Sequence, residues 1–340
     1  MISAEKLKEL KGFLDKSENP LIFFDSDGDG LSSYLLLKQY LNRGKGLVVR
    51  GRPLLSTEYV RKIEENMPDY VFVVDICEID QEFIDQVNVP IIWVDHHPLL
   101  DRKGVKVFNP RIDNKDDESP TTNWIYKCVG GKIWLGFVGS ISDWYIPDFV
   151  DQFKEKYPDL LGNYKNIADI LYTTEIGKLT KVFSFVLKGT FSEARKVISI
   201  LAKIEEPYEI LNQTTPRGRF IWKRYEKINA RYQELLQQAL KAEGKLLVFT
   251  YPSGRWSFSS DLSNELIYRN PDKIILVGRA VENEIRFSLR GLNYDLPSLL
   301  EKALEGINGY GGGHKHSCGG AVKQEDFSKF IENFEKLIQG

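Results

Sequence analysis

The chain has 340 residues, enough for two domains that each bury a core. Hydrophobic residues make up 42% and charged residues 28% of it, as in soluble globular proteins, and no run approaches the roughly 18 to 20 apolar residues of a membrane span. The net charge of −2 excludes a global positive field for attracting nucleic acid, so a polyanion would have to be held by a local basic surface or by metal ions.

The N-terminal residues form a charged helical pattern without the apolar core of a secretory signal, which predicts a cytoplasmic protein with no membrane attachment. Three widely spaced cysteines fit a reducing compartment better than a disulfide framework.

Short apolar runs alternate with helical patterns in the first part of the chain. Strands are predicted at residues 21–24, 47–50, 70–75 and 90–95, and helices at 31–41, 57–66 and 79–87. Val/Ile-rich runs separated by helices indicate strands that are buried on both faces of a parallel sheet. The predicted fold class is therefore α/β, beginning with a doubly wound parallel-sheet domain.

The pattern changes in the second half. Residues 124–211 are mostly helical, and the charged segment 219–244 predicts one long helix. Shorter elements follow: strands at 245–251, 273–279 and 284–291, and helices at 262–268, 297–304 and 327–338. We therefore predict an N-terminal domain over 1–190, a helical linker over 191–243 and a smaller C-terminal α/β domain over 244–340.

Acidic residues follow the predicted strands of the first domain. The carboxyl ends of parallel strands share one edge of the sheet, and ligands bind just outside that edge. Another acid, Asp143, ends a further apolar segment. The strand-end residues are Asp25, Asp27 and Asp29 after the first strand, Asp75 after the third, and Asp95, His96 and His97 after the fourth.

Such a cluster of carboxylates requires cations. Two carboxylates about 4 Å apart repel by roughly 4 kcal/mol at an effective dielectric constant near 20. Aspartate oxygens with imidazole suit manganese or magnesium better than a thiolate-rich zinc site would. Two such ions roughly 3.5 to 4 Å apart can activate water and clamp a phosphate. The pattern thus predicts phosphoryl hydrolysis.

Two simpler interpretations compete with a metal site. The sequence from Asp25 could begin a calcium-binding EF-hand loop, but the twelfth position is Leu36 rather than glutamate, and a strand rather than a helix precedes it. A single strand-end acid such as Asp75 is more often a cap or turn residue than a ligand. The combination of motifs in order is what favours a metal site.

These motifs resemble those of the DHH phosphoesterase superfamily, in particular its RecJ-like and nanoRNase-like branch with a DHH-associated C-terminal domain. The matching segments are DSDGDGLSS at 25–33, Asp75 in VFVVD, the triplet at 95–97, Asp143 in GSISD and the glycine-rich GGGH at 311–314.

The resemblance implies roles for these residues. Asp95 would orient an imidazole and His97 would contact the scissile phosphate. Asp25 would be a ligand or lie just behind the ligands. The implied cofactors are two divalent ions, with manganese favoured and magnesium as the alternative. The other implied metal ligands are Asp27, Asp29, Asp75, His96 and Asp143.

A strand of the second domain carries a predicted phosphate-binding strip. Arg286, Ser288 and Arg290 alternate with apolar residues and therefore share one face, where guanidinium groups could bind phosphate oxygens; the alternative is a solvated strand face. The other residues of this predicted substrate site are Arg279, Gly312, Gly313 and His314.

The predicted function is hydrolysis of phosphodiester bonds through metal-activated water, as an exonuclease acting on single-stranded DNA or RNA or on short oligonucleotides. The chain lacks the additional oligonucleotide-binding domain of bacterial RecJ, which favours short or single-stranded substrates. One alternative is a hydrolase of cyclic dinucleotides or small phosphoanhydrides. Another is a replication or repair scaffold that binds a helicase or replisome factor, although every expected ligand position is filled.

Overall fold

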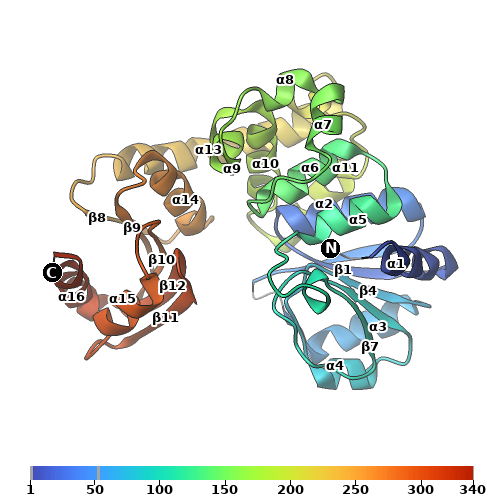
Figure 1. Ribbon diagram of the computed structural model, residues 1–340, viewed down its shortest axis with the longest axis horizontal. Coiled ribbons are helices and arrows are strands. Elements are labelled where there is room, and N and C mark those ends of the chain that lie inside the picture. Colours follow the sequence, from blue (N-terminus) through green and yellow to red (C-terminus); the bar gives the residue numbers. More distant parts are fainter. Residues whose placement is uncertain (1–2, 52–53, 340) are drawn as a thin grey trace. The chain divides into compact units, whose positions relative to one another are not determined.

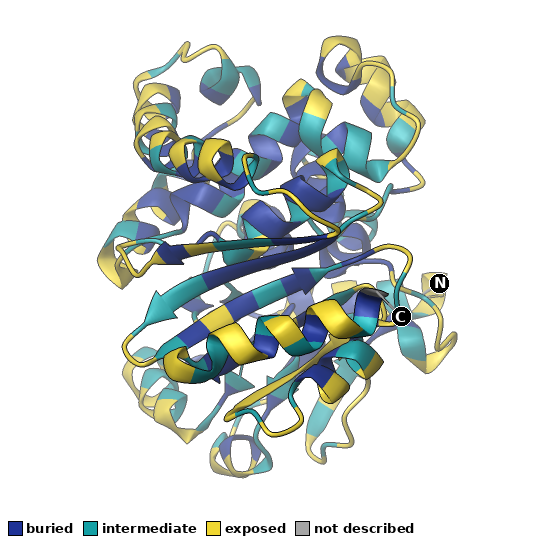
Figure 2. Ribbon diagram, turned by 90° about the vertical axis from the view of Figure 1, so that its left-hand side faces the viewer, coloured by how far each residue is buried: buried dark blue, intermediate teal, exposed yellow. Residues whose placement is uncertain are grey.

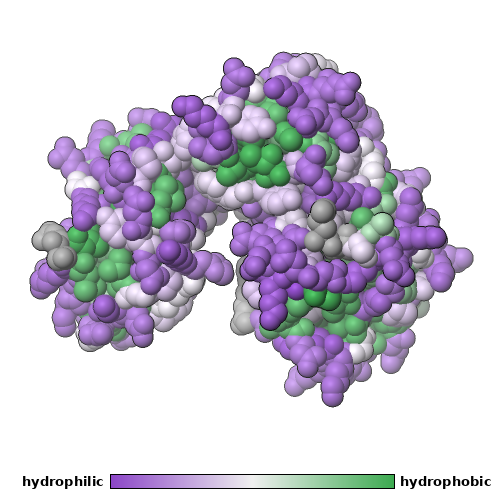
Figure 3. Space-filling model, viewed as in Figure 1, coloured by the Kyte–Doolittle hydropathy of each residue, from purple (hydrophilic) through white to green (hydrophobic). Residues whose placement is uncertain are grey.

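The computed structural model describes residues 3–51 and 54–339. The first residue of the predicted N-terminal domain and the last residue of the predicted C-terminal domain, 1 and 340, lie outside the described residues. The chain divides into two compact units, Met1–Tyr225 and Glu226–Gly340 (Figure 1). The predicted boundaries of the domains and the linker stay predictions. Among the described residues, no helix is both long and apolar enough to cross a membrane. Hydrophilic side chains cover most of the visible face of each unit (Figure 3).

The first unit contains a five-stranded sheet in the order β2-β1-β4-β6-β7. All its neighbouring strands pair in parallel, which confirms the predicted parallel-sheet fold. A separate two-stranded sheet joins β3 to β5. The strands are β1 Leu21–Asp25, β2 Lys45–Val49, β3 Leu54–Leu55, β4 Val71–Val74, β5 Glu78–Ile79, β6 Ile91–Val94 and β7 Val105–Phe108.

Helices cover both faces of this sheet, because its central strands are apolar at every position (Figure 1). On one face, Phe23 and Val73 pack in a core with Phe83. On the other, the ring of Phe24 stacks on Tyr34 with centroids 4.3 Å apart. The helices of these two layers are α1 Ala4–Lys16, α2 Gly28–Leu41, η1 Thr57–Tyr59, α3 Val60–Asn66, α4 Gln81–Gln86 and α5 Thr121–Val129.

The rest of the first unit is helical, as predicted for residues 124–211. The long helix predicted at 219–244 is α13, which runs from Pro216 to Ala239 and contains the division between the units. The other elements are η2 Pro110–Ile112, α6 Ile133–Ser142, α7 Val150–Lys156, α8 Pro158–Leu161, α9 Ile167–Thr173, α10 Glu175–Val186, α11 Phe191–Leu201 and α12 Tyr208–Leu211.

The second unit has a five-stranded sheet in the order β11-β12-β10-β9-β8, and only the β8–β9 pair is parallel. Its core joins Phe287 and Leu289 to Leu300 and Phe330. In Figure 2 the helix in front of this sheet turns an exposed face outward. The elements are β8 Leu246–Pro252, α14 Ser259–Arg269, β9 Ile274–Val281, β10 Glu284–Arg290, α15 Leu296–Ala303, β11 Gly309–His314, β12 Ser317–Lys323, η3 Gln324–Asp326 and α16 Phe327–Gln339.

Two strands of this unit were not predicted. β11 contains the glycine-rich motif, and β12 follows it directly. Glycine has low strand propensity, so the local pattern does not indicate a strand. β12 pairs with β10, and β11 pairs in turn with β12, so pairing supplies the structure that propensity does not.

Candidate metal centre

The first acidic motif occupies the junction between β1 and α2. Asp25 is the last residue of β1, and Asp27 is the N-cap of α2, where its side chain accepts the Gly30 N–H at 2.9 Å. Carboxylates are favoured at this position, since the first N–H groups of a helix lack partners. A Cβ atom at Gly30 would lie 2.6 Å from the Asp25 carbonyl oxygen, so glycine is required for this tight turn. The turn therefore places Asp25, Asp27 and Asp29 at the carboxyl end of the strand.

Asp29 is fully buried and held by the start of α5. Its carboxylate accepts the backbone N–H groups of Thr121 at 2.8 Å and Thr122 at 2.6 Å. These two threonines were missed from the sequence, although a threonine pair after Pro120 is a signal for a helix start. They fix the orientation of the Asp29 carboxylate.

Asp75 directly follows β4 and adopts a left-handed backbone conformation with φ of 58°. Aspartate tolerates this conformation better than most residues because its short side chain can form local hydrogen bonds. The side chain is 1% exposed; Oδ1 accepts a hydrogen bond from Thr121 Oγ1 at 3.2 Å, while Oδ2 has no hydrogen-bond partner. A buried carboxylate oxygen without a partner is costly, and it marks a position that a cation would satisfy.

His96 brings the acids from separate segments together. Its Nε2 atom lies 3.1 Å from Asp143 Oδ2, 3.5 Å from Asp75 Oδ1 and 4.0 Å from Asp29 Oδ2. Nε2 is buried, and no neighbouring atom meets hydrogen-bond geometry with it. Asp143 is the C-cap of α6, so the apolar segment before it is a helix, in line with the helical pattern predicted for 124–211.

Asp95 and His97 form a separate pair at the same edge. The buried Asp95 carboxylate lies 2.9 Å from His97 Nδ1 and accepts the His97 backbone N–H at 3.0 Å. This contact orients the imidazole, whose side chain is 36% exposed. Asp95 lies beside the imidazole of His97, and its predicted role in the site stays a prediction.

Burial and crowding alter the pKa values of the cluster. Burial, followed by the charge of Asp27, raises the pKa of Asp25 to about 7. Burial and the charge of Asp143 raise the pKa of Asp29 to about 6. Burial and the neighbouring aspartates also raise the pKa of Asp75 well above its usual value. Burial alone would lower the pKa of His96, but Asp143 and the other acids raise it to about 9. The site therefore holds more negative charge than its own groups neutralise.

The residues fit divalent metal ions. Three overlapping groups each place one donor atom per residue within 4.8 Å of the others. The donors are carboxylate oxygens and imidazole nitrogens, a set that suits manganese and magnesium. The groups are Asp75 with His96 and His97, Asp29 with His96 and Asp143, and Asp25 with Asp27 and Asp75.

The predicted strip on β10 has the expected alternation, with Arg286 exposed and its apolar neighbours buried. Arg279 on β9 lies directly opposite Arg286 in the ladder. Arg290 differs, because its guanidinium donates to Asn264 Oδ1 at 2.7 Å and to the carbonyl oxygens of Leu289 and Cys318. Its donors are thus already used by the protein. Its predicted contact with substrate stays a prediction, like that of Ser288.

The glycine-rich motif is exposed along β11, which pairs with β12 alone and forms an edge of the sheet. A Cβ atom at Gly312 would meet nothing within 4 Å, whereas one at Gly313 would clash with the backbone at Ser317 and Cys318. Packing therefore requires glycine at 313 but not at 312. His314, the last residue of β11, is also exposed.

Comparison with known protein families matches the DHH family, N-terminal domain, over residues 20–138, and the DHHA1 domain over residues 244–340. No curated protein matches the chain.

Solved structures share the fold at low sequence identity. RecJ in complex with Mn²⁺ from Thermus thermophilus is 16% identical, with a TM-score of 0.69 over 99% of this chain; the chain spans 55% of that RecJ. An exonuclease RecJ bound to manganese is 16% identical, with a TM-score of 0.64, covering 97% of this chain and 94% of that one. The DHH domain of PF0399, described as a member of the s1p family of ribosomal proteins, is 15% identical, with a TM-score of 0.68 and coverage of 98% and 89%.

Both family domains occur in this order, so the chain belongs to the DHH superfamily, and it shares the fold of RecJ over nearly its whole length.

Proposed function

We propose that the protein is a divalent-metal-dependent phosphoesterase that hydrolyses phosphodiester bonds in single-stranded nucleic acid or short oligonucleotides. The observation that carries this proposal is the convergence of acids from separate chain segments on His96, with Asp75 Oδ2 and His96 Nε2 buried and without hydrogen-bond partners. A purely structural role leaves Asp75 Oδ2 without a partner and the carboxylates around His96 incompletely neutralised, whereas bound cations would satisfy both.

The residues of the metal centre would have different roles in hydrolysis. Bound manganese or magnesium would supply an activated water and neutralise phosphate charge. Asp95 holds His97 Nδ1, which leaves Nε2 of that ring for a phosphate oxygen. The hydrogen bond to Asp95 outweighs burial and raises the pKa of His97, which favours the protonated ring as a donor. The ligands would be Asp27, Asp29, Asp75, His96 and Asp143, with Asp25 at the edge of the cluster.

An exposed aromatic side chain supports a substrate with bases. Trp144 directly follows Asp143 and is 40% exposed. Its φ of 59° is uncommon for a bulky residue, and such strained positions concentrate at functional sites. Its ring makes an edge contact with Tyr172, with centroids 6.2 Å apart. An exposed indole beside a metal ligand offers a surface on which a base can stack, which favours nucleic acid over inorganic polyphosphate.

The basic strip of the second unit supports an anionic substrate. Like charges directly opposite one another in a ladder destabilise a sheet. Arg279 and Arg286 are such a pair. The Arg279 guanidinium donates to Ser253 Oγ and the Gly254 carbonyl oxygen, and its Nε is buried without a partner. A phosphate group bound at the two guanidinium groups would offset this repulsion.

The test is hydrolysis of end-labelled single-stranded DNA, RNA and dinucleotides, with manganese and magnesium compared and EDTA as the metal-free control. We expect product ladders from the wild type and none from Asp75→Asn. The exposed substitution Asp101→Asn serves as a matched control and should behave like the wild type. If the wild type leaves all three substrates intact in either metal, the proposal is wrong.

The same panel tests the alternatives. Cleavage of cyclic dinucleotides or small phosphoanhydrides in preference to linear strands would favour the second enzymatic prediction. The predicted scaffold function and its helicase or replisome partner stay predictions.

A further inference from the structure

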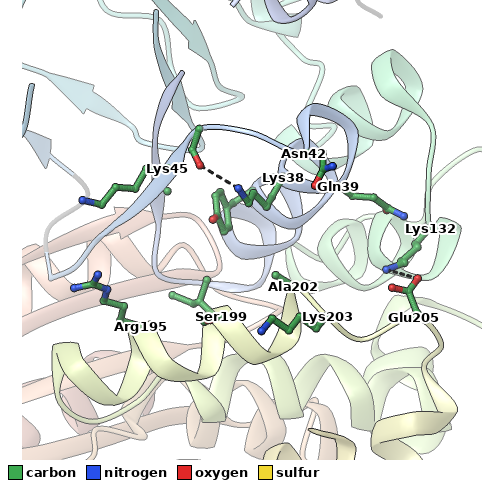
Figure 4. Close-up of a pocket in the computed structure, with 14 residues that line it drawn as sticks. Lys38, Gln39, Asn42, Lys45, Lys132, Arg195, Ser199, Ala202, Lys203 and Glu205 are labelled. Atoms are coloured by element: carbon green, nitrogen blue, oxygen red, sulfur yellow. Dashed lines mark hydrogen bonds and ion pairs between the residues drawn. The ribbon is translucent and has the colours of Figure 1, made fainter. Parts of the chain in front are cut away.

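The first unit has a polar cavity at the edge of the parallel sheet opposite the metal centre. Strands β1 and β2 are parallel, with Leu21 paired to Lys45 and Asp25 paired to Val49. Asp25 is therefore at one edge and Lys45 at the other. The cavity has a volume of about 550 Å³ and is bounded by α2, the start of β2, and α11 with the segment after it (Figure 4).

Basic side chains dominate this cavity. Five cationic residues and a single acid, Glu205, line it, although the whole chain carries a net charge of −2. In Figure 4, Lys45 and Arg195 lie on opposite walls near one end, and the Lys132–Glu205 pair lies at the other end. The cationic residues are Lys38, Lys45, Lys132, Arg195 and Lys203.

Local structure accounts for two of these cations. Lys38 Nζ donates to the Gly44 carbonyl oxygen at 3.0 Å, just beyond the end of α2. Lys132 Nζ donates to the Ile204 carbonyl oxygen at 2.8 Å and lies 2.9 Å from Glu205 Oε2. Cations near helix C-termini stabilise the exposed carbonyl groups there, so both residues have a structural role.

The other three cations have no anionic partner among the described residues. Lys45 Nζ donates to the neutral Asn66 Oδ1 at 2.8 Å. Across the part of the chain that the structure describes, the side chains of Arg195 and Lys203 form neither a hydrogen bond nor an ion pair. Cations gathered in a concave surface raise the local positive potential, which a bound anion would offset.

The lining favours recognition by charge rather than by base stacking. Tyr34 is the one aromatic residue among the described residues of the lining, and its ring is buried against Phe24. Gly46 packs directly against this ring as well, so closely that a Cβ atom would clash. A base therefore has no free aromatic face here, whereas a run of phosphates has several donors.

We propose that this cavity binds a small oligophosphate anion, that is, two or three linked phosphate groups, either free or as the tail of a nucleotide. The volume falls within the range of roughly 300 to 1,000 Å³ that is usual for small-molecule sites. Along α2, Asp29 at the metal centre and Lys38 at this site are separated by about 14 Å. The bound anion is therefore distinct from the substrate at the metal centre.

The test is isothermal titration of the full chain with inorganic triphosphate and with ATP, in EDTA and at low salt. Without metal, the acidic centre repels phosphates, and binding to the strip of Arg279 and Arg286 is common to all variants, so the binding lost in the cavity variant reports the basic cavity. The double variant Arg195→Ala/Lys203→Ala should weaken binding by about tenfold or more, because guanidinium and ammonium groups supply charge-assisted hydrogen bonds to phosphate. Lys196→Ala is the matched control on the same helix: Lys196 lies over Phe220, outside the cavity, and its loss should leave binding unchanged.

Several results would overturn the proposal. One is a wild type that binds neither ligand. Another is a double variant, with an unchanged melting temperature, that binds as tightly as the wild type. A third is single-stranded DNA bound through Arg195 and Lys203 while triphosphate is not. Equal affinity for triphosphate and ATP would support recognition of the phosphates alone. The double variant should keep wild-type hydrolysis of oligonucleotides, so this test fails or succeeds independently of the proposed function.

Discussion

Replacing Asp75 by asparagine removes one charge from the metal centre while keeping the shape of the side chain. Asparagine tolerates the left-handed φ of 58°, and its Oδ1 can still accept the hydrogen bond from Thr121 Oγ1. The variant should therefore fold. It should also relieve the repulsion that the metal-free protein carries at this site.

The magnitude follows from the geometry. Asp75 has donor atoms within 4.8 Å of those of Asp25 and Asp27. Each such pair repels by about 3.5 kcal/mol at an effective dielectric constant near 20, and attraction to His96 offsets roughly one of the two. For these two pairs about 3.5 kcal/mol of repulsion is thus removed, less the part that protons already neutralise, because the pKa of Asp75 is raised. For a unit of this size we expect the melting temperature without metal to rise by roughly 3 to 10 °C.

The assay is thermal unfolding in EDTA and across a manganese titration. Wild type should gain about 2.7 kcal/mol at a manganese concentration about one hundred times the dissociation constant, and Asp75→Asn should gain little. Asp101→Asn, an exposed acid of the same unit, should follow the wild type in both conditions. A variant that is less stable than wild type in EDTA and equally stabilised by manganese would refute the reasoning.

Three further predictions concern pH and the substrate surfaces. The folded-state pKa values of Asp29, about 6, and Asp25, about 7, lie above the ordinary value of 3.8, so their contribution to the stability of the metal-free protein is lost as pH rises through these values. The pKa of His96 is also raised, to about 9, so its contribution to stability is likewise lost as pH rises. Urea unfolding in EDTA should therefore show that the free energy of unfolding falls from about pH 5 to about pH 9. A free energy of unfolding that rises over this range would contradict the electrostatic account. Trp144→Ala should raise KM for a short oligonucleotide about tenfold and leave KM for an abasic strand of the same length unchanged, because stacking on one base is worth about 1 to 3 kcal/mol; equal effects on both substrates would exclude a stacking role. Gly312→Ala should have the melting temperature of the wild type, because the added Cβ atom meets open space. It should raise KM for oligonucleotides, because the methyl group would obstruct a phosphate that approaches this backbone. The control Gly12→Ala in α1 should leave KM unchanged, and an unchanged KM for Gly312→Ala would exclude such an approach.

The acids at the edge of the sheet could be predicted from the sequence, because the position of a residue at a strand end follows from a simple rule. Asp25, Asp75 and Asp95 each end an apolar run, and parallel strands bring their carboxyl ends to one edge. The position of helix α6 was harder to predict, because hydrophobic periodicity does not show which end of a helix approaches the sheet. A Cβ atom at Gly28 would lie 2.5 Å from Ser142 Cβ, so the close approach of α2 and α6 depends on that glycine and brings Asp143 to the site.

The second unit contains contacts that could not be predicted from the local sequence pattern. Alternation along β10 predicts correctly which residues share a face, but it cannot show that Arg290 donates to Asn264 and to two carbonyl oxygens. Those partners depend on tertiary packing, which the local pattern does not contain. The same holds for β11, which its glycines disfavour and its pairing with β12 stabilises.

The most direct test of the metal centre is a crystal structure of the protein grown with manganese, with anomalous data collected at the manganese edge. We expect anomalous peaks bounded by Asp27, Asp29, Asp75, His96 and Asp143. A well-ordered site without an anomalous peak, at a manganese concentration that supports hydrolysis, would contradict the account.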